Sequence, residues 1–491
     1  MSDAASRPFP AVPPMPPPQP GPVERSLRRF SSAPVPPISL PLIGAVLAVG
    51  VAVPVLVVGH EPGLGLALAV PLLWAPAVPT LVRRRAWGLL LTAALAVALG
   101  AMAAVRDAEW VVALCLLAAF GLSAVAATGA RSPLGLLLAV PTVPVATTRG
   151  VRWFARGVST AGSGRREEAL RVLRTALLTL VILGVFGTLL ASADAVFASL
   201  LPSLDLRTLP VQLAVGAAAT VAALGIASLA VRRPPWSVVR MSRPAVRRRV
   251  EWYVPLLALD ALMLAFLLTQ LVAAAGGEAY VQQIAGISYA SYARQGFGQL
   301  VAVTALTLAV VAWFARRAPR EDRSDRLATR ACLAMLCFFA LGVVATALFR
   351  MSLYVQAYGL TELRLLATTG EIVMGAALLL VLVAGVRWRA RWLPLAVVRV
   401  AGIAMLGLAL LNPDALMVRY NTQVQEVPLD TWHLENLSAD AVPAIAALED
   451  PLRSCLLRAY GATEPTSIWE WNHARTQAIA LDDVTNRISC Y

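Results

Sequence analysis

Apolar segments of about 20 residues recur along most of this chain, and no other feature constrains its fold as strongly. A helix of that length and composition matches the thickness of the hydrocarbon core of a bilayer. The 491 residues are 58% hydrophobic and only 14% charged, whereas soluble domains carry about 25% charged residues. The sequence therefore predicts an all-α fold, a polytopic membrane helical bundle surrounded by the lipid bilayer.

Eleven spans are predicted from these segments. They cover residues 39–58, 64–82, 86–105, 109–128, 171–191, 210–231, 252–274, 297–315, 329–349, 367–386 and 393–411. The stretch 133–148, "PLGLLLAVPTVPVATT", is shorter and contains three prolines. We expect an interfacial or re-entrant segment there rather than a further span.

The arginines predict which way the bundle faces, because cytoplasmic loops are enriched in basic residues near the helix ends. All 42 basic residues of the chain are arginine. With a cytoplasmic N-terminus, 30 arginines fall on the cytoplasmic side and five in the outer loops. We therefore predict a multi-pass plasma-membrane protein with an extracytoplasmic C-terminus. The arginines punctuate apolar runs and form no single basic face, which argues against a nucleic-acid partner.

Three regions follow from this topology. Residues 1–37 are rich in proline, serine and alanine and are predicted to be a disordered cytoplasmic tail. Residues 38–411 form the transmembrane helical domain, and residues 412–491 form a small extracytoplasmic helical domain. In that last region Ser438 or Asp440 has the character of a helix cap. An exported tail meets an oxidising compartment, so Cys455 and Cys490 form either a disulfide or two free thiols, with equal weight.

Several ordered motifs resemble one family of multipass membrane proteins. They are "LLASADAVFASLL" (189–201), "YASYARQGFGQLVAVTALTL" (289–308), "RMSLYVQAYGLTELR" (350–364), "NPDALMVRYN" (412–421), "LSADAVPAI" (437–445) and "WEWNHAR" (469–475). The family belongs to high-GC Gram-positive bacteria and is grouped as a domain of unknown function of the 4153/4173 type. The resemblance covers roughly residues 170–480. It implies a polytopic membrane protein and transfers no catalytic residue.

Motifs of soluble enzymes and metal sites are scarce. A P-loop needs a lysine, which this chain lacks. The three histidines are His60, His433 and His473, too few and too scattered for the three or four convergent ligands of a zinc site. We therefore predict neither a metal nor a cofactor.

Asp260 is the most informative single residue, because it lies inside the predicted span 252–274. An ionised carboxylate at that depth is costly unless it pairs with a cation. Two interpretations stay open. Asp260 is part of a proton or cation pathway or a substrate contact, or it is a neutral acid bonded to a neighbouring helix.

A second candidate site lies on the predicted outer face. The stretch "RMSLYVQAYGLTELRLLATTGEI" (350–372) carries arginine, tyrosine and acidic side chains, and the other outer loops add more. Such a rim suits an anionic or sugar-like ligand. The alternative is an interfacial tyrosine belt with arginines at the lipid phosphates. The residues proposed for this pocket are Arg294, Arg350, Arg364, Glu371, Tyr292, Tyr354, Tyr358 and Asp194.

Three functions are compatible with these observations. The favoured one is a non-enzymatic envelope sensor, scaffold or binding protein whose exported C-terminal domain contacts an envelope protein or an anionic or lipid-linked ligand. The second is a secondary transporter that uses Asp260. The third is a glycosyltransferase-like membrane enzyme acting on lipid-linked substrates, for which the outer acids are Asp194, Asp205 and Glu278.

Overall fold

A computed structural model describes residues 21–32, 38–160, 207–234, 236, 250–285, 296–317, 323–387, 390–423, 429–458, 460 and 464–481, with scattered residues between 174 and 193. Every regular element in these ranges is a helix. The predicted span 171–191 falls largely outside them.

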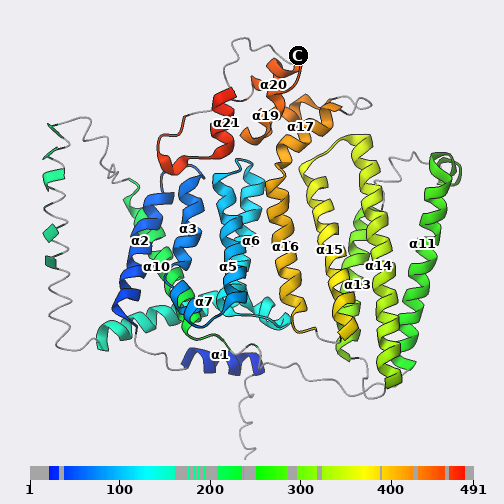
Figure 1. Ribbon diagram of the computed structural model, residues 1–491, viewed down its shortest axis with the longest axis horizontal. Helices are drawn as coiled ribbons and strands as arrows, with labels where there is room; N and C mark the ends of the chain where they lie inside the picture. Colours follow the sequence, from blue (N-terminus) through cyan, green and yellow to red (C-terminus); the bar gives the residue numbers. More distant parts are fainter. Residues whose placement is uncertain are drawn as a thin grey trace, which may run out of the picture.

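The long helices stand side by side in two groups (Figure 1). The first group contains α2 (Leu40–Val57), α3 (Leu64–Trp74), α4 (Val78–Arg83), α5 (Trp87–Ala101), the short η1 (Met102–Ala104), α6 (Glu109–Thr128) and α10 (Leu209–Val231). The second contains α11 (Val250–Ala285), α13 (Phe297–Arg317), α14 (Arg323–Tyr358) and α15 (Glu362–Arg387). Helix α16 (Leu393–Leu410) packs against α5 and α6 on one side and α15 on the other, so it joins the groups.

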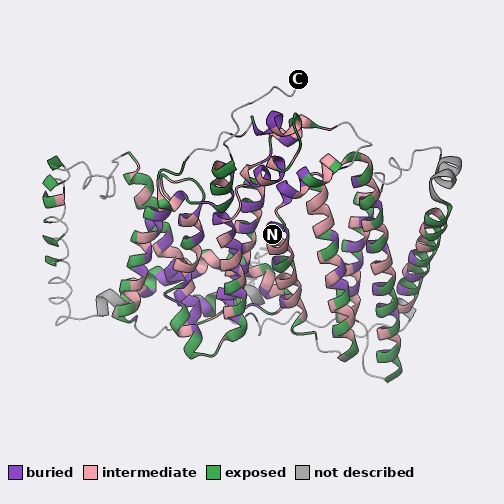
Figure 2. Ribbon diagram, turned by 45° about the horizontal axis from the view of Figure 1, so that its top comes forward, coloured by how far each residue is buried: buried purple, intermediate pink, exposed green. Residues whose placement is uncertain are grey.

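Nine of the described helical segments are long and apolar enough to cross a membrane. Eight of them coincide with predicted spans, and the ninth is α7 (Pro133–Thr160). The predicted span 64–82 is interrupted between α3 and α4, where Pro76 removes a backbone donor, and Pro79 follows in the first turn of α4. Buried residues are frequent in the first group and sparse along α11 (Figure 2).

Helix α7 lies across one end of the bundle (Figure 1). Its Ala139 shares a hydrophobic cluster with Val125, near the end of α6, and with Leu395, near the start of α16. Further along, Gly150 of α7 lies against Leu224, in the last third of α10. Length alone would let α7 span a bilayer, but these contacts at helix ends suit the interfacial segment expected at 133–148.

The structure differs from the prediction at the N-terminus. Residues 1–37 were expected to be disordered, yet Pro22–Ser32 form helix α1. Its Phe30 is only 2% exposed and packs in a cluster with Trp74 and Leu81, and the guanidinium of Arg149 lies over the Phe30 ring. An apolar contact that composition conceals therefore orders this stretch. Residues 1–20 and 33–37 lie outside the described part of the chain.

The other end of the bundle is covered by the C-terminal segment, which comprises α17 (Pro413–Gln423), α18 (Thr431–Glu435), η2 (Ala439–Ala441), α19 (Val442–Ala446), α20 (Leu452–Leu457), η3 (Ile468–Glu470) and α21 (His473–Leu481) (Figure 1). Its buried Met417 and Ile445 belong to one hydrophobic cluster with Met351 and Val355 of α14. The predicted domain boundary at residue 412 therefore divides a single packed core.

Candidate functional site

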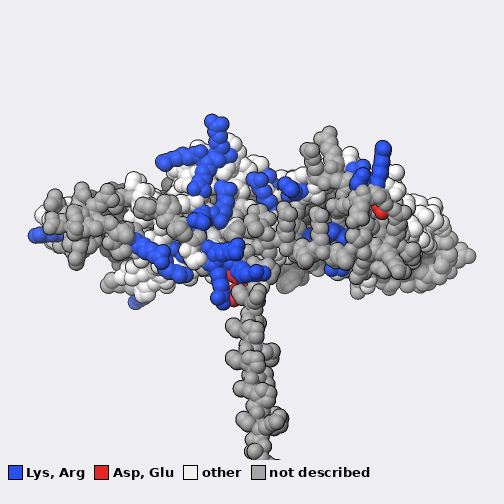
Figure 3. All heavy atoms as spheres, turned by 90° about the horizontal axis from the view of Figure 1, so that it is seen from below, with Lys and Arg blue, Asp and Glu red and all other residues white. Residues whose placement is uncertain are grey.

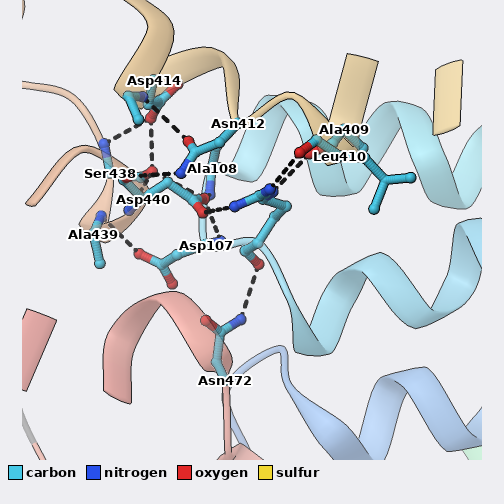
Figure 4. Close-up of polar contacts among 12 residues, drawn as sticks. Asp107, Ala108, Ala409, Leu410, Asn412, Asp414, Ser438, Ala439, Asp440 and Asn472 are labelled. Atoms are coloured by element: carbon cyan, nitrogen blue, oxygen red, sulfur yellow. Dashed lines mark hydrogen bonds and ion pairs between the residues drawn. The ribbon is translucent and has the colours of Figure 1, made fainter. Parts of the chain in front are cut away.

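The C-terminal segment is fixed to the bundle by a buried polar network centred on Asp440 (Figure 4). The Asp440 side chain is 1% exposed. Its carboxylate accepts hydrogen bonds from the backbone N–H of Asp107 at 2.6 Å and of Ala108 at 2.9 Å. These donors precede the first turn of α6, where backbone N–H groups lack helical partners and a negative charge is stabilised. Asp440 thus caps a bundle helix from more than 300 residues away in sequence.

Arg106 connects the same carboxylate to a second helix. It donates to Asp440 at 3.1 Å, to the carbonyl of Ala409 at 2.6 Å and to that of Leu410 at 2.9 Å. Those carbonyls end α16, where helix acceptors are left over. One guanidinium therefore ties together the start of α6, the end of α16 and the C-terminal segment (Figure 4).

Two further side chains complete the network. Asp414, 2% exposed, accepts from the backbone N–H of Ser438 at 2.9 Å and from its hydroxyl at 2.6 Å. Asn472, also 2% exposed, donates to the carbonyls of Ala103 and Arg106 at 3.0 and 2.9 Å. Burial raises the pKa of Asp414, which the hydrogen bonds from Ser438 partly offset. Because the network satisfies buried polar groups on both partners, it holds the segment in one position.

Beside this network lies a cavity of about 540 Å³ between the loop 59–61 and residues 464–479. It is lined by Gly59, His60, Glu61, Glu464, Pro465, Thr466, Glu470, Asn472, Arg475, Thr476 and Ile479. The loop belongs to the connection between α2 and α3, and the other residues belong to the C-terminal segment. The cavity therefore exists only while that segment is docked.

The polar side chains of this cavity are held in place by one another. Glu470 accepts from the backbone N–H and the hydroxyl of Thr466, both at 2.8 Å, and lies 3.4 Å from His60 Nδ1. Arg475 forms an ion pair with Glu61 and donates to the carbonyl of Pro62 at 2.7 Å. Burial alone would raise the pKa of Glu470, but the hydrogen bonds from Thr466 and His60 outweigh it, so this pKa lies below its usual value.

The charge of Asp107 links the network to the cavity. Its carboxylate lies 3.7 Å from Arg475 Nε and accepts from the backbone N–H of Ala439 at 3.3 Å. Burial raises the pKa of Asp107, and the nearby carboxylates of Asp440 and Glu61 raise it further, against the lowering effect of Ala439 and Arg475.

Within the residues that the structure describes, no group of three or more His, Cys, Asp and Glu side chains is arranged to hold a metal ion.

The predicted intramembrane acid Asp260 and the predicted outer-pocket residue Glu371 are both buried. Asp260 is 3% exposed and Glu371 is fully buried. Among the described residues, neither carboxyl group has a hydrogen-bond partner. The proposed bond of a neutral Asp260 to a neighbouring helix is therefore not seen.

The outer pocket predicted from 350–372 is brought together only in part. Tyr354 and Tyr358 pack edge to face at 5.1 Å, and the Arg364 guanidinium lies 4.2 Å from the Tyr354 ring centroid. Arg364 donates to the carbonyls of Tyr358, at 2.8 Å, and Gly359. It therefore supports the end of α14, and no hydrogen bond or ion pair between the described residues joins it to Glu371.

The remaining predicted residues lie apart from this group. Arg350 was expected to end its span, but α14 continues to Tyr358, and Arg350 is buried with its guanidinium 2.8 Å from Gln270 Oε1. Tyr292, Arg294, Asp194 and Asp205 lie outside the described residues, and only the backbone of Glu278 is described. Cys455 is buried in α20 and is disulfide-bonded, so it is not the free thiol that the sequence left open. Cys490 lies outside the described residues, so its place as the partner stays a prediction.

Sequence reasoning missed the network and the cavity, although a signal was present. Asp414, Asp440, Asn472 and Arg475 all lie inside motifs that carried the family resemblance. Their role was hidden because Asp440, Asn472 and Arg475 pair with the 103–108 region or the loop 59–62, hundreds of positions away. Asp414 pairs nearer in sequence, with Ser438.

Comparison with known proteins agrees with this architecture. The family model described as "Domain of unknown function (DUF4153)" matches residues 93–448. The match begins well before residue 170, where the motif resemblance started, and includes α6, α16 and the Asp440 network except Asn472. No match was found among curated proteins or among solved structures. The long apolar helices and the family match together show an integral membrane protein that belongs to the DUF4153 family.

Proposed function

We propose that this protein is a non-enzymatic binding protein of the cell envelope, with its ligand site in the cavity between the loop 59–61 and the C-terminal segment. The observation that carries the proposal is that cavity, whose walls are joined by the ion pair of Arg475 with Glu61 and by the contact of His60 with Glu470. The arginine bias supports an extracytoplasmic position for it, since its walls, the loop 59–61 and the C-terminal segment, belong to the side predicted to carry few arginines.

The lining favours an uncharged ligand rich in hydroxyl groups, such as an envelope saccharide. Glu61, Glu464 and Glu470 offer carboxylate acceptors, while Asn472 and Arg475 add an amide and a guanidinium. Planar polar groups of this kind hydrogen-bond to neighbouring hydroxyls. An anionic ligand would meet three carboxylates and only one arginine, so the anionic alternative is disfavoured here.

Calorimetric titration of envelope oligosaccharides into the full-length protein tests this proposal, in a detergent without a sugar headgroup. We expect Glu470→Gln to weaken binding at least about tenfold, because a hydrogen bond to a charged group contributes about 1.5–3 kcal/mol. Glu449→Gln is the matched control, since Glu449 is exposed in the same segment and does not line the cavity. Equal affinities for the two variants would refute the site, and recovery of a cleaved or extended saccharide would refute a non-enzymatic role.

A secondary transporter is the second candidate, and two separate buried acids favour it. Asp260 and Glu371 belong to α11 and α15, and neither has a hydrogen-bond partner among the described residues. A carboxyl group in that setting must be protonated or bind a cation. If the protein couples transport to protons, Asp260→Asn abolishes uptake into proteoliposomes driven by a pH gradient, whereas the peripheral Glu109→Gln does not.

A further inference from the structure

A second cavity, of about 320 Å³, lies at the end of the bundle opposite the C-terminal segment. It is lined by residues 86–89, at the start of α5, and by four arginines, which are Arg84, Arg85, Arg131 and Arg233. They come from three separate places in the chain, namely the connection between α4 and α5, the residues after α6 and the residues after α10. Figure 3 shows this end of the molecule, where arginines far outnumber acidic side chains on the visible surface.

The positive charges in this cavity are not balanced by its lining. The described lining residues include no carboxylate. Burial lowers the pKa of Arg233, and the charges of Arg84 and Arg131 lower it further. Like charges brought this close repel one another unless an anion lies between them.

Two local features constrain the conformations of Arg85 and Arg233. Arg85 has a φ of +51°, a left-handed conformation that favours glycine over any residue with a side chain. The stem of Arg233 packs on Gly129, where an added Cβ would lie 2.9 Å from Arg233 Cδ. Gly129 therefore leaves room for the stem of Arg233, and Arg85 occupies a backbone conformation that glycine would adopt more easily.

The surroundings identify the anion as part of a lipid. Trp87, at the start of α5 and in the lining, is 63% exposed. Tryptophan with an exposed ring at a helix end is typical of the membrane–water interface. Basic pockets between transmembrane helices bind phosphate headgroups, and arginine forms paired hydrogen bonds to phosphate.

We propose that this arginine cavity binds the phosphate of an anionic membrane lipid, with Trp87 against the glycerol and acyl region of the same molecule. The site is independent of the saccharide cavity at the other end of the bundle. It belongs to a different surface, and each site is tested by its own ligand and variants.

The test measures thermal unfolding of the purified full-length protein with added phosphatidylglycerol, with phosphatidylcholine and with soluble pyrophosphate. The triple variant Arg84→Gln, Arg131→Gln, Arg233→Gln removes three charges from the cavity. The matched control Arg152→Gln, Arg316→Gln, Arg391→Gln removes three exposed charges outside the cavity lining. We expect phosphatidylglycerol to stabilise the wild type and the control alike, and its affinity for the cavity variant to fall at least about tenfold.

Equal loss in the two triple variants would overturn the proposal, because it would mean that surface charge alone attracts the lipid. Stabilisation by pyrophosphate without any by phosphatidylglycerol would also overturn it, since the site would then take a free anion. Arg85→Gly guards against a folding artefact. Glycine suits the positive φ, so this variant should unfold at the same or a higher temperature without lipid and still bind phosphatidylglycerol more weakly.

Discussion

Asp440 is the residue on which docking of the C-terminal segment most depends. Its carboxylate accepts two backbone N–H groups before α6 and pairs with Arg106, whose side chain is only 11% exposed. Removing one member of a buried ion pair leaves the other charge uncompensated, at a cost of about 3–5 kcal/mol. We expect Asp440→Ala to lower the unfolding temperature in detergent and to expose the C-terminal segment to protease. The control Asp430→Asn keeps a good N-cap on α18 and should change little. Equal protease resistance of Asp440→Ala and wild type would contradict this role.

A second prediction at the residue scale is that Glu470 makes the stability of the docked C-terminal segment depend on pH. Its pKa in the folded protein lies below the ordinary value of 4.5, so its charged form stabilises the docked segment above that value. This contribution is lost as the pH falls through the lowered pKa. Asp107 and Asp414 have raised pKa values, so their ionisation lowers the stability of the folded protein as the pH rises. The pH dependence of wild-type stability therefore combines these opposite contributions. The difference in unfolding temperature between wild type and Glu470→Gln isolates Glu470, and it should shrink as the solution is made acidic. A difference that grows toward acid would reverse the sign of this assignment.

At the scale of elements, the end of α14 is set by Gly359. This residue has a φ of +77°, and an added Cβ would lie 2.8 Å from Asn421 Oδ1. That oxygen accepts from the Leu360 backbone N–H at 2.6 Å, while Asn421 Nδ2 donates to the Leu360 carbonyl at 2.9 Å. Gly359→Ala should therefore destabilise the protein by about 1–2 kcal/mol. Gly370→Ala, in open space inside α15, should be neutral or stabilising. Thermal unfolding of both variants checks the prediction, which fails if they shift in the same direction.

The same helix shows what the sequence could and could not predict about elements. Hydropathy located the apolar centre of α14 but ended it at residue 349, whereas the helix runs to Tyr358. The polar residues after Phe349 contain no helix breaker before Gly359, so the helix continues where hydropathy stops. The sequence assigned Arg364 and Glu371 to one outer pocket, but it gave no sign that Arg364 would turn to the carbonyls at the end of α14. Distant side-chain partners decide such orientations, and a hydropathy pattern carries no information about them.

For the whole molecule, composition was enough to predict an all-helical membrane bundle, because a long apolar run in lipid has few alternatives to a helix. The candidate site could not be predicted from the sequence. Its parts come from the loop 59–61, the 103–108 region and residues 409–479, and only tertiary packing brings them together. Asp260 was found in advance because an acid in an apolar run is visible within the sequence itself.

The orientation of the bundle is the prediction on which the saccharide site depends. The C-terminal segment and the arginine cavity lie at opposite ends of the bundle. If one of them faces the cell exterior, the other faces the cytoplasm. We expect a membrane-impermeant thiol reagent to label Glu449→Cys in intact cells and to label Arg323→Cys only after lysis. Both positions are exposed, and the described native cysteines are buried, so they give little background. Labelling of Arg323→Cys in intact cells would reverse the topology, place the arginines outside against the positive-inside bias, and exclude an envelope saccharide as the ligand of the cavity.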